Sequence, residues 1–138
     1  MRGNEVAKGP AELASRREDA ERRLMRMAQR DPLVAATVRC VAANSGVPAA
    51  ELLRRDRHAA IAAARQLAMY LVNVKLEYTM TRVGALFGRD RTTVAHACMA
   101  VEDRRDEPAF DEAVSRLEAE IDRFTQAEPA EELRHAAG

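Results

Sequence analysis

The stretch "RVGALFGRDRTTVAHAC", residues 82–98, decides the fold that this sequence predicts. Apolar residues at helical spacing indicate a short helix over residues 79–87, and Gly88 is the type of residue that ends a helix. Asp90 is a typical helix N-cap, because its carboxylate can accept backbone N–H bonds from residues two or three positions later. A short helix, a glycine turn and a second helix form the layout of a helix-turn-helix.

The second helix of this layout separates apolar from polar side chains. Its buried stripe is expected to consist of Val94, Ala97, Cys98 and Val101. The opposite face carries Thr92, His96, Met99 and Asp103. Short polar groups at the start of a helix can bind a metal, catalyse a reaction, cap the helix or contact a nucleic acid, and the rest of the sequence helps to choose among these.

Composition favours an all-α fold, a helical bundle that contains the helix-turn-helix. Hydrophobic residues make up 47% of the 138 residues and aromatic residues only 4%. Alanine, leucine, arginine and glutamate, which favour helices, are abundant, and β-branched runs are missing. Further helices are expected over residues 11–30, from Asp31-Pro32 to the "NSGVP" break at 44–48, over 47–53, over 59–77 and over 110–124.

The chain divides into three expected parts. Residues 1–31 form an N-terminal extension whose first ten residues look disordered and whose remainder is an amphipathic helix with a thin apolar stripe. Residues 32–125 form the helix-turn-helix domain. Residues 126–138 form a polar, alanine-rich flexible tail.

Charge is balanced overall but not locally. Lys and Arg number 22, as do Asp and Glu. Residues 54–105 hold ten Lys/Arg and five Asp/Glu, a net charge of +5, and the remainder holds twelve and seventeen, a net charge of −5. A basic middle between acidic flanks suggests a polyanion site in the middle, although charges spread over solvated helix faces account for the same counts.

Several function classes lack their usual residues. The sequence has no GxxxxGK[ST] phosphate loop, no CxxC or HxxxH companion for its histidines, and no spacing typical of a nucleophilic triad. Cys40 and Cys98 are expected to be reduced, buried small hydrophobes. No secretory signal is visible, and no apolar run approaches the roughly 18 residues of a membrane span. We therefore expect no enzymatic activity, cofactor, metal or membrane contact, and a cytoplasmic, nucleoid-associated location.

The same polar groups suit DNA recognition. Arg91 can donate two hydrogen bonds to a guanine edge, threonine methyls can meet thymine methyls, and N–H groups at a helix start can bind phosphate. A helix-turn-helix places its second helix in the major groove. Each residue also has an ordinary structural role: Asp90 caps a helix, Thr92 and Thr93 are common first-turn residues, and His96 can be a surface histidine.

Three motifs resemble the C-terminal DNA-binding domain of the bacterial replication initiator DnaA. They are "ARQLAMYL" (64–71), "RVGALFGRDRTTVAHAC" (82–98) and "VED" (101–103). The upstream "VAANSGVPAAELL" (41–53) and the basic loop 54–57 also fit, so the resemblance covers about residues 32–107. It implies an all-α, Trp-repressor-like bundle that binds double-stranded DnaA boxes.

The resemblance assigns candidate DNA contacts residue by residue, and basic charge adds further phosphate contacts. Arg57 corresponds to an arginine in the minor groove, and Arg65 and Gln66 to contacts with the DNA backbone. The remaining assignments are Met80 and Thr81 at bases, Asp90, Arg91, Thr92 and Thr93 in the major groove, and His96 at phosphate. By charge, Arg89 could also hold phosphate, as could Lys75 and Arg82.

The chain departs from the family pattern in ways that bear on function. The family's FGGRDH is FGRDR here, one glycine shorter and with arginine in place of a base-reading histidine, so we expect a tighter elbow and a changed target sequence. Asn73 and Met99 stand where basic residues are common, which predicts weaker phosphate binding. About 30 residues precede the domain where the initiator has an ATPase module, which suggests a free-standing relative.

The expected function is sequence-specific binding of double-stranded DNA, as a transcriptional regulator or a modulator of replication initiation. The alternative is a helical protein-interaction module with a vestigial DNA-binding surface. In that case the helices at 11–30 and 110–124 would bind a second copy of the chain or a replication or transcription protein.

Overall fold

The computed structural model describes residues 9–54 and 58–137, of which residues 127–137 are described by their backbone alone. Its elements are α1 (Pro10–Arg30), α2 (Pro32–Ser45), the 3₁₀ turn η2 (Ala49–Leu53), α3 (Ala59–Val74), α4 (Met80–Phe87), α5 (Arg91–Arg104) and α6 (Pro108–Ala137). No strand occurs within these ranges, so the all-α expectation is confirmed. Of the ten residues expected to be disordered, 1–8 lie outside the described residues and Pro10 already begins α1.

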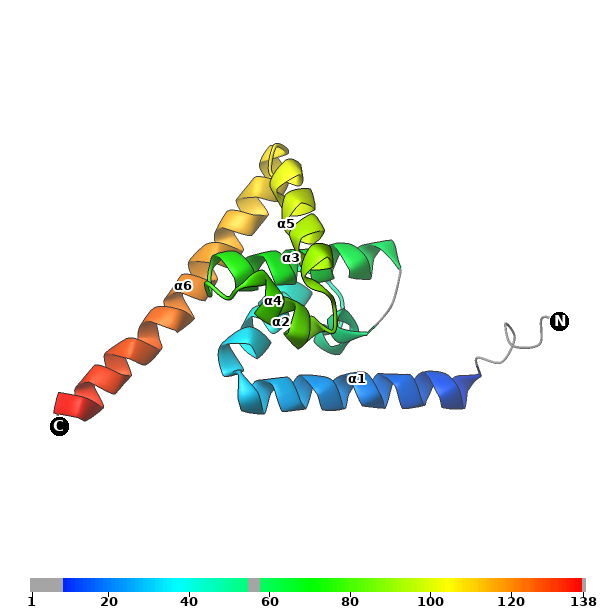
Figure 1. Cartoon of the computed structure of the whole chain (residues 1–138), viewed down its shortest axis with the longest axis horizontal. Coiled ribbons are helices and arrows are strands. Elements are labelled where there is room, and N and C mark those ends of the chain that lie inside the picture. The colour runs from blue at the N-terminus through cyan, green and yellow to red at the C-terminus, as the bar shows by residue number, and fades with distance from the viewer. Residues whose placement is uncertain (1–8, 55–57, 138) are drawn as a thin grey trace.

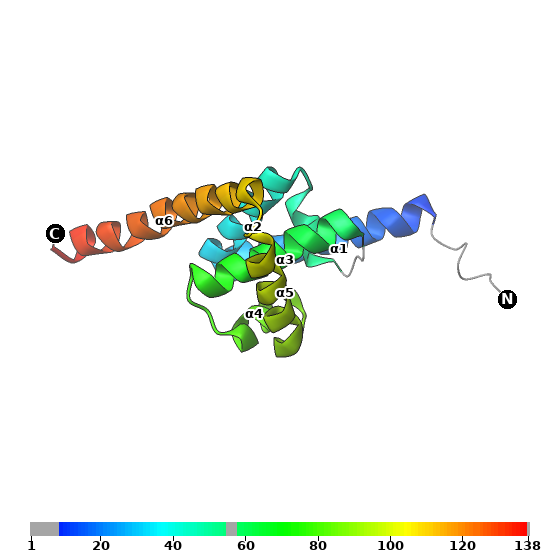
Figure 2. The ribbon, with the colours of Figure 1, turned by 90° about the horizontal axis from the view of Figure 1, so that it is seen from above.

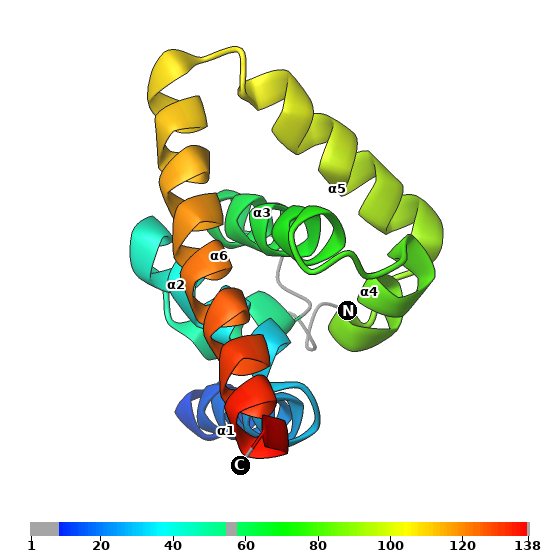
Figure 3. The ribbon, with the colours of Figure 1, turned by 90° about the vertical axis from the view of Figure 1, so that its left-hand side faces the viewer.

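Helix α3 is the centre of the bundle. It packs against α2, η2, α4 and α5, and Figure 3 shows it between α2 on one side and the α4–α5 pair on the other. The core contains mostly small and medium apolar side chains, the largest fully buried ones being Leu52, Met69, Leu71, Ile121 and several valines. Each such burial contributes on the order of 1.5–3 kcal/mol.

The first and last helices extend from opposite ends of the bundle. Figures 1 and 2 show α1 leading to the N-terminus at one end and α6 leading to the C-terminus at the other. Helix α1 buries only Ala20 and Met27 and packs against η2 and α2, while Leu13 stays 43% exposed. The thin apolar stripe expected for this helix is therefore confirmed.

Two helix ends differ from expectation. Helix α3 ends at Val74 instead of Glu77, which takes a left-handed φ of 62° in the turn that follows. The Asn73 side-chain nitrogen donates to the Tyr78 carbonyl at 2.8 Å across this turn, a contact that local periodicity does not reveal. Helix α6 continues to Ala137, so residues 126–137 are helical where a flexible tail was expected. Alanine and glutamate, which are frequent there, favour the helix.

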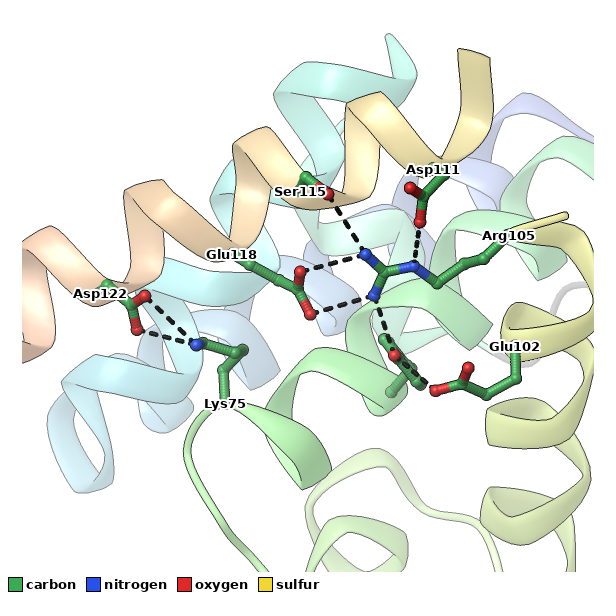
Figure 4. Close-up of polar contacts among 8 residues, drawn as sticks. Lys75, Glu102, Arg105, Asp111, Ser115, Glu118 and Asp122 are labelled. Carbon is green, nitrogen blue, oxygen red and sulfur yellow. Dashed lines mark hydrogen bonds and ion pairs between the residues drawn. The ribbon is translucent and has the colours of Figure 1, made fainter. Parts of the chain in front are cut away.

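A half-buried arginine holds α6 against the bundle. Arg105 Nε lies 2.6 Å from Asp111, and its Nη1 lies 3.1 Å from Glu118 and 3.0 Å from the Tyr70 hydroxyl (Figure 4). Tyr70 in turn donates to Glu102 on α5 at 2.7 Å. The bond to Glu118 is the main cause that raises the pKa of Arg105. This network joins α3, α5 and α6 at the C-terminal end of α5, far along the helix from its polar first turn.

Candidate nucleic-acid interface

Two glycines shape the elbow between α4 and α5. Gly88 caps α4 in the left-handed conformation, with a φ of 68°, and the Arg89 N–H donates to the Gly84 carbonyl at 2.8 Å. Gly84 is buried, and a Cβ at this position would meet the Arg89 carbonyl oxygen. The two helices can approach this closely only because position 84 has no side chain. Gly88 is thus sufficient for the turn despite the glycine that is missing relative to the family pattern.

Asp90 starts helix α5 as the sequence predicts. Its Oδ1 accepts the Thr93 backbone N–H at 2.8 Å. This bond is the main cause that lowers the pKa of Asp90, so the exposed carboxylate is charged at neutral pH. The N-terminal end of the helix carries partial positive charge and free backbone donors, which attract anions such as phosphate.

Helix α5 separates its two faces as expected. The buried stripe of Val94, Ala97, Cys98 and Val101 is confirmed. The polar set of Arg91, Thr92, Thr93 and His96 is exposed, as are Met99 and Asp103. The stripe packs against α3 and α4, so the first turn of α5 has a rigid support beneath it and polar groups directed to solvent. Such an arrangement can offer hydrogen-bond donors and acceptors to the edges of bases.

Two of the candidate phosphate contacts are engaged inside the protein. Arg65 is only 6% exposed, and its Nε and Nη2 donate to the carbonyls of Leu52 at 2.9 Å and Arg54 at 2.7 Å. Arg89 is half-buried and donates to the carbonyls of Phe87 at 3.0 Å and Arg54 at 3.3 Å. The buried Arg65 guanidinium thus holds the segment that leads into the basic loop, and its expected contact with the DNA backbone stays a prediction.

The Arg54 carbonyl is a shared acceptor that connects two parts of the candidate interface. It accepts from Arg65 of α3 and from Arg89 of the elbow, so the end of η2 is tied to the helix-turn-helix. Arg57, the expected minor-groove arginine, lies outside the described residues, three positions after this anchor. Sequence reasoning missed the anchor because its donors lie 11 and 35 residues away along the chain.

A shallow groove between α3 and α5 gathers several of the candidate residues. Arg65, Gln66, Arg89, Thr93 and His96 all line it. The structure therefore brings together residues from two separate motifs, 64–71 and 82–98. Arg91 and Thr92 are exposed on the same first turn as Thr93. Met80 and Thr81 come from the start of α4, where Met80 is half-buried and Thr81 exposed.

The start of α4 is fixed by contacts that sequence reasoning did not identify. Thr79 caps the helix by accepting the Arg82 N–H at 3.1 Å. The Tyr78 hydroxyl donates to Asp31 at 2.5 Å, and Arg82 lies 3.3 Å from the same carboxylate and 3.8 Å from the Tyr78 ring centroid. Burial, with the bond to Asp31, raises the pKa of Tyr78 to about 12. The N-cap of α2 is thereby joined to the first helix of the motif.

The described residues also bear on metal binding, on the cysteines and on membrane spans. No group of three or more His, Cys, Asp or Glu residues there is arranged to hold a metal ion. Both cysteines are free; Cys98 is buried and Cys40 half-buried. Among the same residues, no helix has the length and apolar character needed to cross a membrane.

Comparisons with known proteins agree with this geometry. Residues 34–101 match the family model described as the bacterial DnaA protein helix-turn-helix. The chain is also 41% identical over 69 residues to the chromosomal replication initiator protein DnaA of Symbiobacterium thermophilum. That match covers 49% of this chain and 15% of the relative. Helices α1 and α6 lie outside the matched segment, whose elements run from α2 into α5.

Proposed function

We propose that this chain binds a specific sequence of double-stranded DNA. The premise is that residues 34–101 are a helix-turn-helix domain of the bacterial DnaA family. The family match supports DNA binding in general. The observation that carries the finer proposal is the first turn of α5, where an exposed polar set stands over a buried apolar stripe and a capped helix start.

Each polar residue of this turn has a proposed role in the major groove. Arg91 donates to a guanine edge, and Thr92 and Thr93 contact thymine methyls or phosphate through their side chains. Asp90 can still accept from a cytosine amine through its second oxygen, because Oδ1 is the atom that caps the helix. His96 and Gln66 line the adjacent groove and are proposed to face phosphate, with Met80 and Thr81 at bases and Arg57 in the minor groove.

Selection of preferred duplexes from a random-sequence pool, followed by mobility shift, tests the proposal. Arg91→Ala should weaken binding to the selected site by about 1–3 kcal/mol, roughly 5- to 150-fold, and relax preference at one position. Thr92→Ala should relax a neighbouring position. Met99→Ala, on the same exposed face two turns further on, is the matched control and should leave the preference unchanged. A pool without enrichment, or a preference that survives both changes, would refute sequence-specific recognition.

The process served by this binding is proposed from the relative. The matched protein is named a chromosomal replication initiator, so we propose that this chain acts at DnaA-box-like sites as a modulator of replication initiation or as a transcriptional regulator in the bacterial cytoplasm. Mapping of occupied genomic sites decides between these roles. Occupancy at origins supports the first, occupancy at promoters supports the second, and occupancy without either contradicts both.

A second candidate function is a protein-interaction module. Helix α1 exposes Leu13 (43%) and Met25 (61%), two of the four large apolar side chains that are exposed among the described residues. A second copy of the chain could bury both side chains. Measurement of mass in solution for the wild type and for Leu13→Glu/Met25→Glu tests this. A dimer that the double change dissociates supports the module, and a monomer in both cases removes its self-association form.

A further inference from the structure

An arginine-rich groove lies between α1 and the elbow of the helix-turn-helix. Arg23, Arg26 and Arg30 line it from α1, and Arg89 lines it from the elbow. Its other lining residues are Met27, Leu53, Ala85, Leu86, Phe87 and Gly88. The groove encloses about 310 Å³, and none of the described residues that line it is acidic, so its field favours an anion.

The arginines of α1 fall into two groups according to their partners. Arg22 lies 2.7 Å from Asp19, and Arg16 lies 3.6 Å from Glu12. Arg26 and Arg30, which line the groove, are exposed and have no hydrogen bond or ion pair with any described residue. The groove therefore presents cationic groups whose charge the described part of the protein leaves uncompensated.

The groove is continuous with the proposed DNA surface. Arg89 lines it and also lines the neighbouring groove that holds Thr93 and His96. Arg23 anchors this side of α1 by donating to the Leu53 carbonyl at 3.0 Å, next to the Arg54 carbonyl that holds Arg65 and Arg89. Helix α1 packs against η2, and Figure 1 shows α1 running below this part of the bundle. From Arg26 to Arg30, four residues further on, the helix rises roughly 6 Å.

We propose that Arg26 and Arg30 contact the phosphate backbone of the same duplex that α5 reads, outside the base-reading site. This inference rests on the proposed function. A DNA duplex carries one negative charge per about 1.7 Å of its axis, so the rise of roughly 6 Å between these two arginines lets each contact a different phosphate. The contacts add affinity for any sequence and carry no base preference. Helix α1 lies outside residues 34–101, so the family match does not assign it this role.

The salt dependence of binding tests the inference. Affinity for the selected duplex and for a scrambled one is measured from 50 to 200 mM salt with the full chain and with Arg26→Gln/Arg30→Gln. Loss of two phosphate contacts should lower the slope of log affinity against log salt by about 1.8. The wild type's advantage over the variant should then shrink about 12-fold across this range, equally for both duplexes. Thermal unfolding checks that the variant folds like the wild type.

Arg17→Gln/Arg22→Gln is the matched control, because it removes the same charge from exposed positions of α1 that do not line the groove. Its slope should stay within about 0.5 of the wild type's. If the wild type prefers the selected duplex but both variants show the same slope, the inference is overturned and the proposed function stands. If the wild type shows no preference, the proposed function fails first.

A vesicle experiment separates DNA from another polyanionic surface. Binding of the wild type and of the Arg26/Arg30 variant to vesicles with and without phosphatidylglycerol is measured by co-sedimentation. A variant that keeps the wild-type slope on DNA but loses vesicle binding overturns the proposal in favour of a lipid surface. A variant that loses slope on DNA and retains vesicle binding supports it.

Discussion

Replacing Arg65 with methionine separates a structural role from direct contact with DNA. The change keeps an apolar stem of similar length but removes the bonds to the Leu52 and Arg54 carbonyls, at 2.9 and 2.7 Å. Hydrogen bonds from charged donors contribute about 1.5–3 kcal/mol each. The Arg54 carbonyl keeps its bond from Arg89 at 3.3 Å, so we expect the loss to lie near the lower end, about 3 kcal/mol.

For a chain of this size, such a loss lowers the unfolding temperature by roughly 10–15 °C. Differential scanning calorimetry measures this, with Arg39→Met, at an exposed arginine of α2, as the control that should change little. Salt titration of DNA binding at a temperature where the variant is folded gives the second readout. A buried positioning role leaves the slope unchanged, whereas a direct phosphate contact lowers it by about 0.9. An unfolding temperature within about 3 °C of the wild type together with a lowered slope would refute the structural assignment.

Three further changes have defined outcomes. Gly84→Ala forces a Cβ against the Arg89 carbonyl, so it should cost about 1–3 kcal/mol of stability and weaken DNA binding by shifting α5. Calorimetry measures the stability and mobility shift measures the DNA binding. If neither value changes, the close approach at position 84 is contradicted. Arg105→Gln should lower stability by about 2 kcal/mol, because Arg105 holds α6 at the far end of α5. The slope of log DNA affinity against log salt should stay unchanged. A changed slope would show that Arg105 is linked to the DNA interface. The pKa of Tyr78 is raised to about 12, so the folded state keeps a proton that the unfolded state loses from about pH 10 upward. The free energy of unfolding should therefore fall between pH 10 and 12, and it should fall less steeply in Tyr78→Phe. Equal slopes in the two proteins would contradict the raised pKa.

Local signals predicted the motif itself because its chemistry is local. The cap bond from Asp90 to the Thr93 N–H spans three residues, and the stripe on α5 follows the helical period. The left-handed cap at Gly88 was likewise signalled by the residue type. The same local rules predicted too long a helix at α3. The apolar period continues to Glu77, but the helix ends at Val74 and the bond from Asn73 to the Tyr78 carbonyl closes the turn that follows.

Contacts distant in sequence were outside the reach of such reasoning. Arg65 carries a charge and matches a DNA contact of the family, yet its acceptors at Leu52 and Arg54 lie 13 and 11 residues away and bury it. Arg82 was expected at phosphate, and the structure pairs it with Asp31, 51 residues away. Residue patterns do not predict hydrogen-bond and ion-pair partners that are this distant in sequence, because these partners depend on how the helices cross.

The sequence by itself determined an all-α chain with a helix-turn-helix and the residues of its polar first turn. These follow from helical period, capping chemistry and glycine position, each of which acts over a few residues. Only the tertiary structure decided which arginines are available to an anion. Arg65 and Arg89 are drawn inward by the Arg54 carbonyl, while Arg26 and Arg30 of α1 are left at an open groove beside the elbow. Burial and pairing set the accessibility of a charge, and both depend on elements that meet only in the folded chain.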